Sequence, residues 1–204
     1  NPVMSEGKKT IAFEIAEQLN WISPDQIYVP VGDGCIIGAV YKGFYDLLKL
    51  GWISKIPALV AVQSENSAAV VNALESGGEI IPVKSNTIAD SISVDLPRDG
   101  EKALAAVRHS NGFGILVSDE EILQAQLIMS SSTSIFCEPA SAAAYAGMLK
   151  AAKENRISNL DNIVVLATGT GLKDISSAAK NVQIPVSVSP NIESAEKSLK
   201  ELIH

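Results

Sequence analysis

The stretch that decides the fold is QIYVPVGDGCIIGAVYKGF, residues 26–44. An apolar run at 27–31 is typical of a buried strand, and it ends in the turn Gly-Asp-Gly at 32–34. A helical pattern follows at 37–50. Glycine-rich turns between a strand and a helix can hold an anion, because their backbone N–H groups are accessible and the helix dipole is positive there. The alternative is an ordinary turn in which glycine relieves crowding.

Strand and helix patterns alternate along nearly the whole chain. The predicted strands are 27–31, 58–63, 114–117 and 162–167. The predicted helices are 10–19, 37–50, 66–75, 87–93, 99–109, 118–129, 139–155, 173–180 and 194–203. Such alternation predicts an α/β fold with a mostly parallel sheet, because each crossover helix returns the chain over the sheet.

Two glycine turns, 32–38 and 168–171, each follow a predicted strand. The carboxyl ends of parallel strands share one edge of a sheet, and ligands of such folds bind beyond that edge. We therefore expect the two turns to lie on the same side of the molecule.

Composition narrows the class of protein. The 204 residues are 47% hydrophobic and 19% charged, with a net charge of −7, which argues against disorder and against a nucleic-acid surface. No apolar run is long enough to span a membrane, and the first residues have no signal-peptide core. Cys35 and Cys137 stand far apart, and with only His109 and His204 a metal site lacks ligands. We expect a soluble cytoplasmic protein without a metal.

Two known phosphate-binding motifs fit the first turn poorly. A P-loop needs Lys followed by Ser or Thr after its last glycine, whereas Ala39 and Val40 stand here. A dinucleotide fingerprint needs its third glycine where Ile37 lies, and Gly38 comes one position late. Glu65 lies farther along the chain than the ribose-binding acid of that fingerprint.

Asp33 raises a separate question, because a carboxylate beside a phosphate repels it. We expect its side chain to point away and to hold the turn by hydrogen bonds to loop amides. The alternative is that Asp is simply a favourable turn residue. Cys35 is expected to serve as a small residue of the loop, and His109, near a helix end, is assigned no role.

Six segments occur in one order: EGKKTIAFEIAEQL (6–19), VPVGDGCIIGAVYKGF (29–44), TIADSI (87–92), SDEEIL (118–123), EPASAAAYAGML (138–149) and VVLATGTGLKD (164–174). Together they resemble the threonine synthase family, within the tryptophan-synthase-β-like, fold type II pyridoxal-phosphate enzymes. The resemblance covers residues 1–174. It implies a three-layer α/β sandwich and pyridoxal 5'-phosphate as the cofactor.

The resemblance also assigns cofactor-binding residues. The family's phosphate loop, Gly-Asn-x-Gly-Asn, falls on Gly32, Asp33, Gly34, Cys35 and Ile36. Both asparagines are replaced, so capture of the phosphate would depend on the backbone. The family's pyridine-side threonine falls on Thr168, and a neutral hydroxyl there would not force protonation of the ring nitrogen. Without the family, a capping role for Thr168 in the following turn would be preferred.

Other candidates are weaker. Glu138 opens a helix, where an acid usually serves the dipole, and a site role is the lesser alternative. Ser141 is expected to pack within its helix. Lys173 and Asp174 are expected to shape the turn rather than to react.

The family binds its cofactor through a Schiff-base lysine in an S-x-K-x motif of the N-terminal half, and this chain aligns after that motif. No catalytic lysine is assigned, since Lys8, Lys9, Lys42 and Lys173 have no comparable setting. We therefore expect residues 1–204 to be a single domain, the C-terminal cofactor-holding part of a longer enzyme, with a helical tail at 183–204.

By resemblance, the intact enzyme would convert O-phosphohomoserine and water to threonine and phosphate. Its partner would be a small phosphorylated amino acid, without nucleic acid or membrane, and a homodimer is possible. The isolated chain is expected to be inactive. The alternatives are another fold type II lyase of the serine or threonine dehydratase kind and a non-catalytic nucleotide-binding α/β domain.

Overall fold

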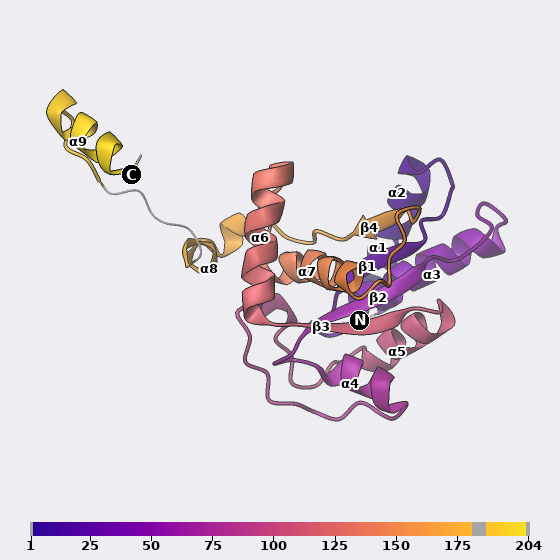
Figure 1. Cartoon of the computed structure of the whole chain (residues 1–204). Coiled ribbons are helices and arrows are strands. Elements are labelled where there is room, and N and C mark those ends of the chain that lie inside the picture. The colour runs from indigo at the N-terminus through magenta and orange to yellow at the C-terminus, as the bar shows by residue number, and fades with distance from the viewer. Residues whose placement is uncertain (1, 181–186, 203–204) are drawn as a thin grey trace.

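A computed structural model of the chain describes residues 2–180 and 187–202 (Figure 1). Its centre is a four-stranded sheet in the order β3-β2-β1-β4. The strands are β1 (Gln26–Pro30), β2 (Ala58–Ser64), β3 (Phe113–Val117) and β4 (Ile163–Val165). All three neighbouring pairs are parallel, and Gln26 of the central strand β1 lies opposite both Ala58 and Ile163. The predicted parallel α/β sheet is confirmed.

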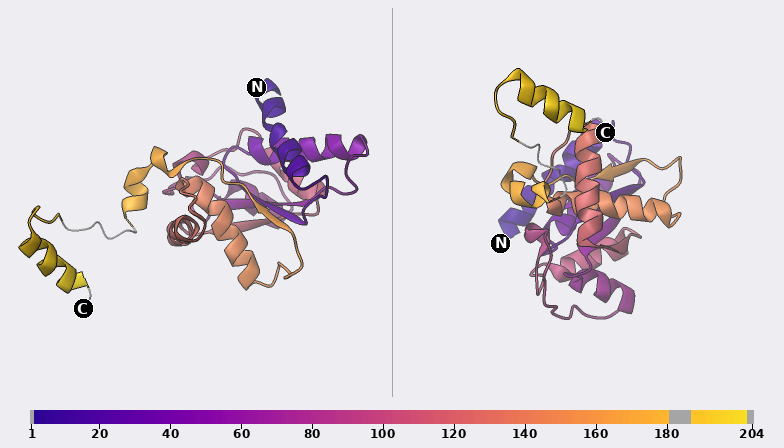
Figure 2. Two further views of the ribbon diagram at one scale, coloured as in Figure 1. Left: turned by 90° about the horizontal axis from the view of Figure 1, so that it is seen from above. Right: turned by 60° about the vertical axis from the view of Figure 1, so that its left-hand side comes forward.

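Helices cover both faces of the sheet, which gives the predicted three layers. The left view of Figure 2 shows α1 to α3 on one side and α6 and α7 on the other. The helices are α1 (Pro2–Lys8), α2 (Thr10–Gln18), α3 (Cys35–Lys49), α4 (Ala69–Ser76), α5 (Gly100–His109), α6 (Asp119–Thr133), α7 (Pro139–Lys153), α8 (Ile175–Ala179) and α9 (Ile192–Leu202), with 3-10 turns η1 (Asp90–Ile92) and η2 (Gly171–Lys173).

Strand β1 joins two hydrophobic cores, one on each face of the sheet. Ile27 and Val29 point into a core shared with α2, α3 and α5, where Phe44 is fully buried. Tyr28 points into the opposite core, which α6 and α7 cover. A parallel strand covered on both faces must be apolar throughout, which is the physical reason for the continuous apolar run.

Several element boundaries differ from those predicted. Helix α3 begins at Cys35 rather than at residue 37, so Cys35 and Ile36 belong to its first turn. Strand β4 is shorter than the predicted 162–167, although the N–H of Leu166 still donates to the carbonyl of Tyr28 at 3.0 Å. Helix α6 runs past the predicted end, to Thr133.

The start of α6 matches its sequence signal. The Ser118 hydroxyl accepts from the Glu121 N–H at 3.1 Å, and the Glu121 carboxylate accepts from the Ser118 N–H at 2.9 Å. This reciprocal capping box satisfies two amides that no preceding turn of helix can serve.

Helix α1 was not predicted, because its seven residues have no apolar period and none is buried. Polar contacts hold it against α3 instead. Lys9 at the α1–α2 junction pairs with Asp46 of α3 at 2.8 Å, and Glu6 accepts from Lys42 of α3. These pairs hold α1 and its junction with α2 against α3.

The chain ends in α9, which lies within the predicted tail at 183–204. Residues 183–186 and 203–204 of that tail, including the predicted helix end at 203, lie outside the described residues. Among the helices of the described chain, none combines the length and the apolar character that crossing a bilayer requires. The described residues also contain no cluster of three or more His, Cys, Asp or Glu side chains arranged to hold a metal ion.

Candidate functional site

A cleft of about 330 Å³ lies at the carboxyl edge of the sheet, where β1 and β4 end side by side. All six residues predicted to bind the cofactor line it, and the two glycine turns meet there as expected. The residues of this carboxyl-edge cleft are Lys8, Pro30, Gly32, Asp33, Gly34, Cys35, Ile36, Ile37, Ser91, Ile92, Glu138, Ala140, Thr168 and Lys173.

The first wall of the cleft is a row of backbone amides at residues 32–37. Gly34 is the N-cap of α3, with φ of +89°, and no side chain caps the helix. Among the described residues, none accepts a hydrogen bond from the N–H groups of 32–37. These free donors, with the positive end of the α3 dipole, form a site that suits an anion such as a phosphate monoester.

Asp33 does not place its charge among these amides. Its Oδ1 accepts from the N–H of Arg98 at 3.1 Å, and its carbonyl oxygen accepts from the N–H of Asp99 at 2.9 Å. The side chain thus holds the turn, as predicted, but it does so through the segment before α5 rather than through the loop's own amides. The Asp33 carboxylate is therefore directed away from the 32–37 amides, and an anion there would be bound by backbone N–H groups.

Gly34 is required by space as well as by its backbone angle. A Cβ on Gly34 would lie 2.8 Å from the carbonyl oxygen of Asp99 and 2.9 Å from Cβ of Ala103. The loop is therefore packed directly on the start of α5.

The second wall of the cleft joins α7 to the turn after β4. The hydroxyl oxygens of Ser141 and Thr168 are 3.0 Å apart, and Ser141 Oγ accepts from the N–H of Gly169 at 2.7 Å. Ser141, expected only to pack within its helix, instead holds this turn in place. Thr168 is exposed and its hydroxyl is oriented by Ser141, so it can present a neutral hydrogen-bonding group to a ligand.

Glu138 is the residue that sequence reasoning valued too little. It is 7% exposed, and its Oε2 lies 3.3 Å from Lys173 Nζ and 3.4 Å from the Ser91 hydroxyl. Glu138 is the N-cap residue of α7, but its carboxylate accepts no hydrogen bond from the amides of that helix. Its side-chain contacts are instead those with Lys173 and Ser91. Its position at the start of the 138–149 segment was the signal that could have identified it.

Two lysines line the cleft. Lys173 is 60% exposed at its side chain and pairs with Glu138. Lys8 reaches the cleft from the end of α1, and its Nζ lies 2.8 Å from Cys35 Sγ. Sequence reasoning missed Lys8, because it did not predict α1.

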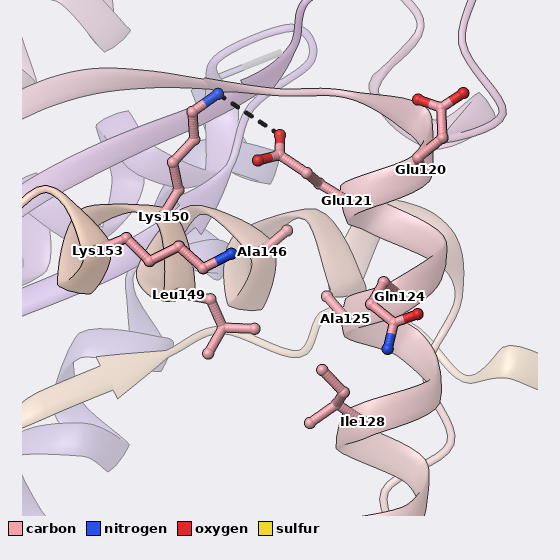
Figure 3. A pocket seen from close by; sticks show the side chains of 9 residues that line it. All are labelled: Glu120, Glu121, Gln124, Ala125, Ile128, Ala146, Leu149, Lys150 and Lys153. Carbon is pink, nitrogen blue, oxygen red and sulfur yellow. Dashed lines mark ion pairs between the residues drawn. The ribbon is translucent and has the colours of Figure 1, made fainter.

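A second hollow, of about 350 Å³, lies between α6 and α7 (Figure 3). Its floor includes the apolar side chains of Leu149 and Ile128, and Lys150 pairs with Glu121 across it at 3.5 Å. Lys150 also donates to the carbonyl of Leu116 at 2.8 Å. None of the predicted site residues lines this hollow, so its similar size does not make it the reactive site.

Comparison with known proteins identifies the family of the chain. The family model described as "Pyridoxal-phosphate dependent enzyme" matches residues 1–169. The chain belongs to the pyridoxal-phosphate dependent enzyme family. The resemblance stated from the six sequence segments is therefore confirmed.

Threonine synthases are among the curated relatives of the chain. That of Methanocaldococcus jannaschii is 39% identical over 204 residues, covering 99% of this chain and 50% of the relative. That of Methanosarcina acetivorans is 38% identical over 201 residues, covering 98% of this chain and 50% of the relative. The chain thus spans about half the length of the curated relatives it matches.

The fold agrees with solved members of the same enzyme class. A fungal L-serine ammonia-lyase from Rhizomucor miehei superimposes with a TM-score of 0.72 at 25% identity, over 90% of this chain and 58% of that one. A processed threonine deaminase isoform from Solanum lycopersicum gives a TM-score of 0.73 over 88% of this chain and 49% of that one, at 24% identity, which supports the fold alone.

Proposed function

We propose that this chain is the cofactor-holding part of a threonine synthase-like lyase that converts O-phosphohomoserine and water to threonine and phosphate. One observation carries the proposal: the free amides at 32–37 and Thr168 line the same cleft. The chain that contains this cleft belongs to the pyridoxal-phosphate dependent enzyme family. The threonine synthase relatives at 38–39% identity support the choice of reaction.

The residues of the cleft fit pyridoxal 5'-phosphate at both ends. The 32–37 amides would hold the phosphate, and the Thr168 hydroxyl, oriented by Ser141, would face the pyridine nitrogen. When bound, the cofactor supplies an electron sink for chemistry at the carbons of an amino acid. A neutral hydroxyl at the nitrogen tempers that sink, because it does not demand a protonated ring as a carboxylate would.

The remaining groups of the cleft have supporting roles. Glu138 would hold negative charge beside the cofactor, and its contacts with Lys173 and Ser91 fix where that carboxylate points. A side chain at Gly169 would have to displace the buried Glu138 carboxylate, with which an added Cβ would collide. The turn after β4 and the start of α7 therefore act as one unit that shapes the pyridine side of the cleft.

The lysine that would hold the cofactor covalently is proposed to belong to a part of the enzyme other than this chain. The substrate would then be a small phosphorylated amino acid bound between the two parts, and the intact enzyme could be a homodimer. A dehydratase-like lyase acting on serine or threonine is the second candidate, because the fungal L-serine ammonia-lyase is 25% identical to this chain over the aligned part.

The decisive experiment supplies the other part. The pure chain is mixed with the separately purified N-terminal half of the Methanocaldococcus jannaschii threonine synthase and with pyridoxal phosphate. We expect O-phosphohomoserine to give equal amounts of threonine and inorganic phosphate, and neither half to do so alone. Formation of 2-oxo acids from serine or threonine, without phosphate release from O-phosphohomoserine, would favour the second candidate.

Cofactor binding is tested on the chain by itself. We expect weak binding of pyridoxal phosphate by calorimetry and increased hydrogen-exchange protection at residues 32–37. A nucleotide-binding domain would respond to ATP instead. Threonine formation by the pure 204-residue chain would contradict the proposal that the reacting lysine lies elsewhere.

A further inference from the structure

Lys8 brings a positive charge to the carboxyl-edge cleft that the glycine turn itself does not contain. It is the last residue of α1, and its Nζ lies 2.8 Å from Cys35 Sγ. Cys35 is the first residue of α3, so the ammonium group lies beside the amino end of that helix. The contact joins residues 27 positions apart and depends on how α1 is placed.

The charge of Lys8 has no carboxylate partner among the described residues. Its neighbours differ: Lys9 pairs with Glu6 and Asp46 at 2.9 and 2.8 Å, and Lys42 also pairs with Glu6. The polar contact of Lys8 in the described chain is the Cys35 sulfur. A half-buried ammonium group that meets only a weak sulfur acceptor retains most of its capacity to donate.

The two acids of the cleft do not cancel this charge. Asp33 turns its carboxylate to the N–H of Arg98, and Glu138 pairs with Lys173 on the opposite wall. The amino end of α3 is thus lined by free amides and one unneutralised cation, and both favour a ligand with negative charge.

We propose that Lys8 binds the phosphate monoester of the cofactor together with the 32–37 amides. This proposal rests on the cofactor assignment under Proposed function. In the family's Gly-Asn-x-Gly-Asn loop two asparagine side chains accompany the backbone, and here Asp33 and Ile36 stand in their places. The ammonium group of Lys8 supplies the polar side-chain contact that the altered loop lacks, in the form of a charge-assisted hydrogen bond.

Lys8 also makes the cleft selective for the phosphorylated form of the cofactor. Backbone amides are neutral donors, whereas an ammonium group adds Coulomb attraction that grows with the charge of the ligand. Pyridoxal, which lacks the phosphate, gains nothing from this contact. Selectivity for pyridoxal phosphate over pyridoxal is therefore the property that Lys8 should control.

The test compares three variants of the full chain: Lys8→Gln, Lys8→Arg and, as matched control, Lys55→Gln. Lys55 carries the same charge, but it pairs with Asp25 rather than with α1 and lies outside the cleft. Affinities for inorganic phosphate, pyridoxal phosphate and pyridoxal are measured by calorimetry, and thermal unfolding verifies that each variant is folded. Lys8 is on an exposed helix without buried residues and the Lys55 side chain is 54% exposed, so we expect all three variants to fold.

Lys8→Gln should weaken binding of inorganic phosphate and of pyridoxal phosphate about tenfold, as expected for one charge-assisted hydrogen bond at a partly exposed site. Binding of pyridoxal should be unchanged. Lys8→Arg should keep most of the affinity, and Lys55→Gln should match the unmodified chain.

Three results would overturn the proposal. The first is phosphate affinity in Lys8→Gln equal to that of the unmodified chain, or no measurable phosphate binding by either. The second is a loss of pyridoxal binding in Lys8→Gln, since Lys8 would then act on the aldehyde; borohydride reduction and peptide mapping would locate the attachment. The third is phosphate binding that still depends on Lys8 after saturation with pyridoxal phosphate, which would assign Lys8 to the phosphate of the substrate.

Failure of the proposed function gives a different pattern. If inorganic phosphate binds in a Lys8-dependent manner but pyridoxal phosphate does not bind, the cofactor assignment falls and Lys8 remains a phosphate-binding residue. If pyridoxal phosphate binds equally well to the unmodified chain and to Lys8→Gln, the function stands and the role of Lys8 falls.

Discussion

Replacing Gly34 with alanine would test whether the support of the amide row is as tight as its geometry indicates. Gly34 has φ of +89°, and an added Cβ would lie 2.8 Å from the Asp99 carbonyl oxygen and 2.9 Å from Ala103 Cβ. The alanine must therefore adopt an unfavourable backbone angle and push against backbone that belongs to α5. We expect both costs to appear in the free energy of unfolding.

The magnitude follows from these two costs. A left-handed backbone costs an L-residue about 1–2 kcal/mol. Forcing an extra methyl group into packed surroundings costs about 1–3 kcal/mol more. Replacing glycine also lowers the conformational entropy of the unfolded chain, which stabilises the folded state by about 0.4–1 kcal/mol. The net expectation for Gly34→Ala is a loss of roughly 1–5 kcal/mol in the free energy of unfolding.

Gly51→Ala is the matched control. Gly51 also has positive φ, at +73°, but nothing lies within 4 Å of the Cβ position. The backbone and unfolded-state costs are shared, so the difference between the two variants isolates the collision with Asp99 and Ala103. We expect Gly34→Ala to be about 1–3 kcal/mol less stable than Gly51→Ala in urea unfolding followed by circular dichroism.

The same variants report on the site. Gly34→Ala should weaken inorganic phosphate binding, because any shift of the turn moves the 32–37 amides, whereas Gly51→Ala should not. Equal stabilities of the two variants would refute the argument that the amide row rests tightly on α5. Unchanged phosphate affinity in a clearly destabilised Gly34→Ala would refute the link between that support and anion binding.

Three further predictions concern the core, pH and the thiols. Phe44→Ala should lower the free energy of unfolding by about 3–5 kcal/mol in urea titration, since Phe44 is fully buried; a loss below 1 kcal/mol would be inconsistent with that core. Hydrogen bonding to Lys55 lowers the pKa of Asp25, so its stabilisation is complete above the unfolded value of about 3.9 and fades as pH falls through the lower folded value. The stability difference between the unmodified chain and Asp25→Asn should accordingly be constant near neutral pH and shrink below about pH 4. Burial raises the pKa of the Cys137 thiol, so a thiol reagent should modify Cys35 first in mass spectrometry, and equal rates would contradict the burial.

Much of the fold could be predicted because its signals are local. Apolar runs followed by helical periods define the strands and crossovers, and their alternation requires a parallel sheet with both glycine turns at one edge. Ser118 and Glu121 likewise identify the start of α6, since a capping box involves neighbours only three positions apart. The family segments then identified the residues of the cleft.

The contacts that shape the cleft could not be predicted in this way. Helix α1 is held by ion pairs with α3 and has no buried residue, so hydrophobic periodicity gives no signal for it. Without α1 there was no reason to place Lys8 beside Cys35. Ser141 was misjudged for a related reason, because its partner Thr168 is 27 positions away and a serine in a helix does not reveal what faces it.

The sequence by itself determined the α/β class, the parallel sheet, the glycine turn that follows β1 and the family to which the chain belongs. Only the tertiary structure decided that Asp33 turns to Arg98, that Glu138 lies buried beside Lys173, and that Lys8 reaches the amino end of α3. The physical reason is range: strand, helix and turn preferences act within a few residues, whereas the direction of a polar side chain depends on partners that only the folded chain brings near.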